Sequence, residues 1–514
     1  MSFSIQGNKG SVSGPIGGSV GPVAEDDFTF TVRRMADSLR SFPGRVSERG
    51  IRQLARNNKF ELFEDTISVG KRISLGGAII LIDIDLKSDQ DEVSNVNLSL
   101  ASTVNPSNPD TSVLSKSLQS TADSILLKLL KEPRLDRFAK VLSVLATTDR
   151  LSLPNSPDCF VAIDEIATAL IKITNEINPQ KDPSSPYGVP GLNRDSSIGL
   201  SIHYWTDRAH NGHSTTTREH CVHWQVREKA YEDSQRDVQN TGVRYSTGWV
   251  SSVNKQDQSV QWNEPEVIKG TKAEFVLVLD PPIMMPDSKA TELNATISSK
   301  KINDGIKRYK ASVYSRTGDL QTIDFIYSSL LRSPLVEVTE IPISHPKDLP
   351  NILGTLRQHS LISALWQSVT GEERRSAVEN EHHDENLMSF ADAIVEEIDS
   401  DLLSGDSNDN SKSSGNANGP SAGDNAQKIA INRPSTTSSV TLIDVDDVSS
   451  AGLALSVKGV GTVELYPQLD GSLRLKNRWV STQEKKPDLA LLQRTADLTR
   501  NLPLMASVLG DCLS

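Results

Sequence analysis

The segment from residue 79 to residue 86 constrains the fold more than any other part of the chain. Every second residue in it is a large aliphatic one, and these are Ile80, Ile82, Ile84 and Leu86. Successive side chains of a β-strand point to opposite faces, so the alternation predicts a strand with one buried face. Residues 96–100 alternate in the same way after a polar break at 87–91. We therefore predict a two-stranded apolar hairpin.

Two short helices are predicted before this hairpin. Residues 28–39 carry apolar side chains at gaps of four, three and four, which is the spacing of one helix face: Phe28, Val32, Met35 and Leu39. Pro43 and Gly44 interrupt this helix, because proline lacks an amide donor and glycine tolerates positive φ. Ser47 is placed to cap a second helix. The residues of that helix expected to face inward are Ile51, Leu54 and Ala55.

The block of residues 26–101 resembles the N-terminal signature of the Mediator subunit 1 family. The residues that carry the resemblance are Leu39-Arg40, Pro43-Gly44-Arg45, Ser47, Gly50, Leu54-Ala55 and the strand 79–85. Three later stretches also fit, namely 135–142, 187–192 and 348–353. The match extends with gaps over most of residues 26–370 and is to the shorter, fungal-type members.

This resemblance implies a function without chemistry. A member of the family is a non-enzymatic subunit of Mediator, the coactivator complex that relays signals from DNA-bound activators to RNA polymerase II. The implied direct partners are other Mediator subunits, of the middle module. The implied contacts also include the activators themselves and, indirectly, RNA polymerase II. The implied location is the nucleus.

Composition excludes several other classes of protein. The 514 residues carry a formal net charge of −12, whereas binding to nucleic acid phosphates requires a basic face. The three cysteines are far apart and form no disulfide framework. The longest candidate membrane run, 78–82, is far shorter than the roughly 20 apolar residues of a spanning helix. We expect no direct contact with nucleic acid or membrane.

Pattern changes along the chain predict an α+β fold with six segments. We expect a disordered tail (1–24), an N-terminal α/β block (25–101) and a small helical bundle (111–177). A mainly antiparallel β region with a closing helix (195–370) follows, and then an acidic low-complexity linker (371–435). Residues 436–514 read as four short strands and a helix split near Pro503. The sequence does not decide whether this last segment joins the earlier β region or stands alone.

Two features of the β region are predicted from composition. Residues 207–240 are polar and read as an insertion between strands. Pro281 and Pro282 are expected to end the strand that begins at Ala273, because proline cannot donate to a central ladder.

A group of histidines and one cysteine is the strongest candidate for chemistry: His203, His210, His213, His220, Cys221 and His223. Imidazole and thiolate are good zinc ligands. However, the spacing matches no standard zinc finger, and the polar insertion around the group does not fix a tetrahedral geometry. We predict no metal site and no cofactor. The alternative hypothesis is a zinc-dependent hydrolase built on the segment from His210 to His223.

Two further patterns receive structural interpretations. Asp83 and Asp85 lie on one face of the predicted strand and could act as paired carboxylates, but we interpret them as its solvated face. Residues 126–130 match L-x-x-L-L, the motif by which coactivator helices bind nuclear receptors. We interpret Leu126, Leu129 and Leu130 as core residues of a bundle helix, which cannot present them to a receptor. We therefore predict no catalytic residue, and a scaffold protein outside transcription remains a third hypothesis.

Overall fold

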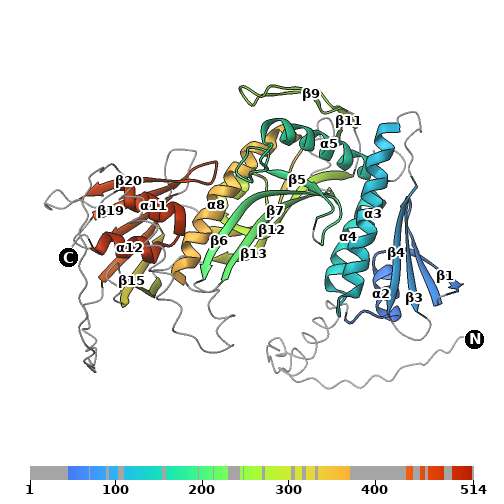
Figure 1. Cartoon of the computed structure of the whole chain (residues 1–514), viewed down its shortest axis with the longest axis horizontal. Helices are drawn as coiled ribbons and strands as arrows, with labels where there is room; N and C mark the ends of the chain where they lie inside the picture. The colour runs from blue at the N-terminus through green and yellow to red at the C-terminus, as the bar shows by residue number, and fades with distance from the viewer. Residues whose placement is uncertain are drawn as a thin grey trace, which may run out of the picture.

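A computed structural model describes residues 44–511. The gaps within this range are 69, 88–91, 102–108, 153–157, 195, 212–213, 230–242, 247, 269–271, 303–306, 315–319, 330–333, 371–435, 444–451, 458–460 and 480–488. The fold is α+β, as predicted. Its elements form an elongated row, with the N-terminal sheet at one end and the C-terminal strands and helices at the other (Figure 1). The predicted tail 1–24, helix 28–39 and linker 371–435 lie outside the described residues.

The N-terminal unit is one helix and a four-stranded antiparallel sheet. Its elements are α2 (Glu48–Asn57), β1 (Glu61–Ile67), β2 (Gly70–Gly76), β3 (Ile80–Lys87) and β4 (Val93–Leu100), with strand order β1-β2-β3-β4. Ser47 caps α2 as predicted, because its side chain accepts a hydrogen bond from the Gly50 N–H. The predicted hairpin is β3 and β4. Strands β1 and β2 were not predicted. Most of β1 is exposed, so its sequence lacks the apolar alternation that indicates a strand.

Three helices follow, near the predicted positions: α3 (Pro109–Lys131), α4 (Asp136–Leu151) and α5 (Cys159–Ile177). Their buried side chains divide between two cores. Those of α3 and most of those of α4 join the N-terminal sheet, whereas those of α5 join the larger β region. α4 also contacts β7 (Ser214–Glu228), a strand of that region, and thereby connects the two parts.

The first large sheet has six strands in the order β13-β16-β12-β7-β6-β5. Their bounds are β5 (Val189–Leu192), β6 (Leu200–Asn211), β7 (Ser214–Glu228), β12 (Ala273–Pro286), β13 (Thr296–Ile302) and β16 (Leu335–Pro342). β6 and β7 form a long antiparallel hairpin. The prediction that residues 207–240 are an insertion was therefore wrong over 207–211 and 214–228. Residues 206–211 pair with residues 214–219 across the hairpin, although this outer part of the ladder is polar and shows no apolar alternation.

The prediction that Pro281 and Pro282 end their strand was also wrong, since β12 continues to Pro286. Pairing of β12 with β7 ends at Asp280, and its pairing with β16 is interrupted between Val278 and Ile283. Both prolines fall in this interruption. Neither one therefore has to donate a ladder hydrogen bond, which removes the physical objection to proline.

Smaller elements surround this sheet. Two short antiparallel pairs are formed by β8 (Val243–Tyr245) with β11 (Glu266–Ile268), and by β9 (Val250–Val253) with β10 (Val260–Trp262). A short helix, α7 (Asp287–Glu292), and a 3-10 turn, η1 (Pro346–Asp348), precede the long helix α8 (Leu349–Thr370).

The second large sheet joins segments that are far apart in the sequence. Its order is β14-β15-β17-β18-β19-β20, with β14 (Lys307–Tyr314), β15 (Leu320–Ser329), β17 (Thr436–Ile443), β18 (Gly452–Val457), β19 (Gly461–Pro467) and β20 (Leu473–Trp479). β15 pairs with β17 in parallel, and the other pairs are antiparallel. The helices α11 (Leu489–Thr499) and α12 (Leu502–Asp511) pack on this unit, and α12 also contacts α8. Residues 436–511 therefore complete the earlier β region.

Candidate interaction surface

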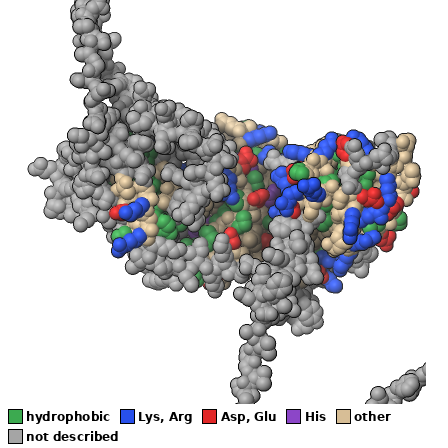
Figure 2. Space-filling model, turned by 90° about the horizontal axis from the view of Figure 1, so that it is seen from below, with side chains coloured by type: hydrophobic (Ala, Val, Ile, Leu, Met, Phe, Trp, Pro, Cys, Tyr) green, Lys and Arg blue, Asp and Glu red, His purple; other side chains and the backbone are tan. Residues whose placement is uncertain are grey.

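One face of the N-terminal sheet packs on the core, and the other face points away from it. The inward side chains include Ile73, Leu75, Ile82 and Ile84, all fully buried. The strand register aligns the remaining side chains in three rows across β1 to β4. We call this surface the open face: Glu61, Gly76, Leu81 and Ser99; Phe63, Ser74, Asp83 and Asn97; Asp65, Arg72, Asp85 and Asn95. Charged side chains of both signs gather at this end of the molecule (Figure 2).

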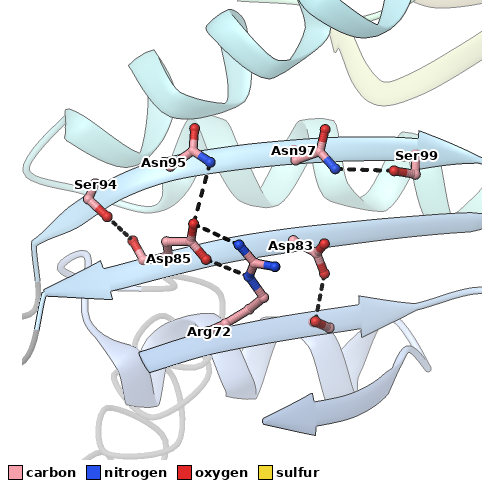
Figure 3. Close-up of polar contacts among 8 residues, drawn as sticks. Arg72, Asp83, Asp85, Ser94, Asn95, Asn97 and Ser99 are labelled. Carbon is pink, nitrogen blue, oxygen red and sulfur yellow. Dashed lines mark hydrogen bonds and ion pairs between the residues drawn. The ribbon is translucent and has the colours of Figure 1, made fainter. Parts of the chain in front are cut away.

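The two carboxylates predicted as a solvated pair lie in the middle of the open face, where both are hydrogen-bonded (Figure 3). Arg72 donates from Nε to Asp85 Oδ1 at 2.7 Å and from Nη2 to Oδ2 at 3.1 Å. Ser74 Oγ donates to Asp83 Oδ1 at 2.6 Å. The hydrogen bonds from Arg72 hold the pKa of Asp85 below its ordinary value, although burial opposes them. Asp85 therefore stays ionised and is not suited to acid–base catalysis.

The prediction that Asp85 is solvated was wrong, because only 7% of it is exposed. The guanidinium of Arg72 and the amide of Asn95 lie over its carboxylate, and Asn95 Nδ2 donates to Oδ2 at 3.4 Å. Asp83 is half-buried and hydrogen-bonded to Ser74. These contacts join β2, β3 and β4 side by side, so the pair stabilises the sheet and fixes the shape of its outer surface.

Two large apolar side chains are exposed on the open face. Phe63 on β1 is 53% exposed and Leu81 on β3 is 38% exposed. Gly76 lies between these strands, opposite both Glu61 and Leu81. A Cβ at Gly76 would lie 3.1 Å from Cε2 of Phe63, so the phenyl ring rests against the glycine. The result is a small apolar area within a polar and acidic surface, a combination typical of protein-binding sites.

The two edges of this sheet differ. At the β4 edge, Asp123 of α3 accepts a hydrogen bond from the Leu98 N–H at 2.6 Å, so a helix covers the strand. Among the described strands, β1 pairs with β2 alone and lies at the outer end of the molecule (Figure 1). β1 therefore presents one row of backbone donors and acceptors that no described strand pairs with.

On the opposite face, an ion-pair network holds β1 and β2 to α2. Glu64 accepts from Arg52 at 2.6 Å and from Lys71 at 2.7 Å. Glu48 of α2 pairs with the same two cations. The hydrogen bond from Lys71 is the largest cause lowering the pKa of both glutamates. The charge of Glu64 is therefore balanced within the chain, whereas Glu61 and Asp65 on the open face form no ion pair with a described residue.

The histidine group does not form a metal site among the residues that can be placed. His213 and the side chain of His210 lie outside the described residues. His220 and His223 are three positions apart on β7, so they point to opposite faces of the sheet. His220 is buried edge-on against Tyr204, and burial lowers its pKa to about 4. His223 lies 3.8 Å from Asp280 on the other face.

Other members of the group are engaged locally. His203 Nε2 lies 2.9 Å from the Trp205 carbonyl oxygen and 3.0 Å from Thr206 Oγ1. His203 pairs with Cys221 across the hairpin, on the face away from His220. Within the described part of the chain, no three His, Cys, Asp or Glu side chains lie close enough to hold a metal ion. The zinc hydrolase hypothesis thus gains no support.

The L-x-x-L-L match is part of the core, as predicted. Leu126, Leu129 and Leu130 are each at most 2% exposed and belong to the core shared by α3, α4 and the N-terminal sheet. The α3 helix therefore cannot present these leucines to a receptor groove without leaving its sheet. In the described residues, no helix is long and apolar enough to cross a membrane.

The open face was missed because half of its residues lie on β1 and β2, which the sequence did not predict. Phe63 lies among charged residues, and Arg72 lies on a strand with little apolar alternation. One signal was available. The apolar face of β3 indicates a central strand with a neighbouring strand on each side, and those strands also flank its polar face. The register that brings Phe63, Gly76 and Leu81 together comes from strand pairing and not from any local motif.

The fold and the open face are those of a protein with preorganised contact surfaces, and its described residues contain no metal cluster. Comparison with known families identifies it further. A family model described as Mediator of RNA polymerase II transcription subunit 1 matches residues 33–371. The chain belongs to this family and is a Mediator subunit, part of the coactivator machinery that regulates transcription by RNA polymerase II. A search of curated proteins returned no match.

Proposed function

We propose that this chain is a non-enzymatic subunit of the middle module of Mediator, that it works in the nucleus, and that it helps relay signals from DNA-bound activators to RNA polymerase II. Its contribution is binding energy between proteins. The other Mediator subunits are its direct partners, and RNA polymerase II is an indirect one.

The open face is the single observation that most supports this proposal. It places Phe63 and Leu81, two of the few large apolar side chains exposed among the described residues, on one rigid sheet. The hydrogen bonds among Arg72, Ser74, Asp83 and Asp85 fix the side chains beside them. A preorganised surface of this kind binds with little loss of side-chain freedom.

The test is co-purification of the tagged full chain with Mediator. We expect Phe63→Ser combined with Leu81→Ser to lower the amount of other subunits recovered, while the melting temperature of the chain stays unchanged. The matched control is Leu489→Ser on α11, which removes an apolar side chain that is 37% exposed elsewhere. Ile82→Asp buries a charge in the core and serves as the misfolded reference.

Normal recovery of the complex with the double variant would show that the open face is not a Mediator contact. Recovery that falls equally with Leu489→Ser would show that loss of any exposed apolar group has this effect. Either result would remove the support that the open face gives to the proposal.

A further inference from the structure

We infer that the edge of β1 with which no described strand pairs accepts an extended, basic segment of a partner protein, which adds to the N-terminal sheet as a fifth strand. This inference rests on the proposed function and names the chemistry of the partner. The partner strand would carry basic, apolar and basic residues at alternate positions, facing Glu61, Phe63 and Asp65.

The backbone of β1 is suited to strand addition. The strand has seven residues, its side chains are exposed at five positions, and β2 occupies one side of it. The edge of β4 is covered by α3, and β5, an edge strand of the first large sheet, is mostly buried. An added strand at β1 would satisfy main-chain donors and acceptors and would gain specificity from alternate side chains.

The charge of β1 on the open face selects the partner. Glu61 and Asp65 are exposed and form no ion pair with a described residue. Arg72, which lies opposite Asp65 in the register, is already engaged by Asp85. Phe63 lies between the two acidic residues on the same face. The complementary strand is therefore basic at two positions and apolar between them, and this pattern is the same for a parallel or an antiparallel partner.

The same charges disfavour a second copy of this chain. An antiparallel pair of two β1 strands centred on Phe63 would place Glu61 of one copy opposite Asp65 of the other. Like charges directly opposite each other destabilise a strand pair, and edge charges are a common defence against self-association. A basic partner converts this repulsion into attraction.

The first experiment uses a synthetic peptide, Thr-Lys-Thr-Val-Thr-Lys-Thr, and the purified full chain. We expect binding that weakens with salt and that slows hydrogen exchange of the β1 amides. Glu61→Lys combined with Asp65→Lys should weaken binding at least about tenfold and should favour a peptide with Glu in place of Lys. The matched control is Glu264→Lys with Glu266→Lys, an equal charge change at two exposed glutamates away from β1.

Three results would overturn the inference: no binding to the unaltered chain, binding without protection of the β1 amides, or equal weakening by the control pair. Co-purification separates this inference from the proposed function. If the Glu61/Asp65 variant recovers Mediator normally while the Phe63/Leu81 variant does not, the open face is a contact but the basic strand is wrong. If both variants recover Mediator normally, the proposed contact fails as well.

Discussion

Replacing Asp149 with asparagine should strongly destabilise the N-terminal sheet, although the substitution changes only one heavy atom. Asp149 lies near the end of α4 and is 5% exposed. Its Oδ2 accepts from the Ala78 N–H at 2.7 Å, and its Oδ1 accepts from the N–H groups of Ile79 and Ile80 at 2.7 and 3.0 Å. This carboxylate therefore fixes the turn between β2 and β3. The turn is tight, since a Cβ at Gly77 would lie 2.5 Å from Oδ2.

The loss of stability follows from the number of hydrogen bonds that an asparagine side chain can still accept. Its one amide oxygen can serve two N–H groups, while its NH₂ group faces the third. One hydrogen bond to a charged group is worth about 1.5–3 kcal/mol, and an unpaired buried donor costs about 1–3 kcal/mol. We expect Asp149→Asn to lower the free energy of unfolding of this unit by about 2–4 kcal/mol. Asp149→Ala should cost more, because it leaves three donors unpaired.

The assay is urea unfolding of the full chain, combined with hydrogen exchange at residues 78–80, which reports the turn itself. The control is Asp136→Asn, because Asp136 pairs with a largely exposed Arg134 and such pairs contribute about 0–1 kcal/mol. If Asp149→Asn changed the free energy of unfolding no more than Asp136→Asn, and residues 78–80 exchanged at the unaltered rate, the carboxylate would not be fixing this turn.

Two further predictions concern other parts of the chain. A chain ending at residue 370 should aggregate, because it lacks β17 and the buried Leu455 and Leu465 of the shared core, and residues 436–514 supplied separately should restore a monodisperse complex; a monomeric 1–370 with an unchanged melting temperature would contradict this. Asp164→Asn should raise the melting temperature at pH 8 and have little effect near pH 4. Burial raises the pKa of Asp164 from its ordinary value of 3.8 to about 6, so the folded state binds this proton more tightly than the unfolded state does. The protein therefore loses stability as the pH rises from the ordinary pKa through the raised one. A melting temperature that is unchanged at pH 8 would refute it.

Local patterns predicted those parts of the fold that local forces determine. The alternation around Ile82 identified β3, and the hydroxyl of Ser47 identified the start of α2, because a strand face and a helix cap depend on a few neighbouring residues. Strand β1 depends on a partner and on ion pairs with α2. Its sequence, in which Phe63 is surrounded by charge, contains neither of these.

The outcome for the histidines has a similar cause. Once residues 214–228 are known to form a strand, the spacing of His220 and His223 alone places them on opposite faces. The polar composition of this segment indicated a loop, and a loop sets no such restriction. The Asp83 and Asp85 prediction used the right periodicity, but it did not include Arg72, whose strand was not predicted and which covers Asp85.

The family match ends at residue 371, immediately after α8, but the physical unit does not end there. Arg357 of α8 is 2% exposed and donates to the carbonyl oxygens of Tyr204 at 2.9 Å and Leu469 at 3.4 Å. Gln358 donates to the Pro467 carbonyl oxygen at 3.1 Å. Arg357 also donates to the carbonyl oxygens of Pro183 and Ser185. Loss of the turn between β19 and β20 would remove the Leu469 acceptor from this buried guanidinium and the Pro467 acceptor from Gln358, so the turn stabilises α8. The segment 436–511 is therefore part of the same folded body as the matched region, and binding sites on that body should be mapped with the full chain.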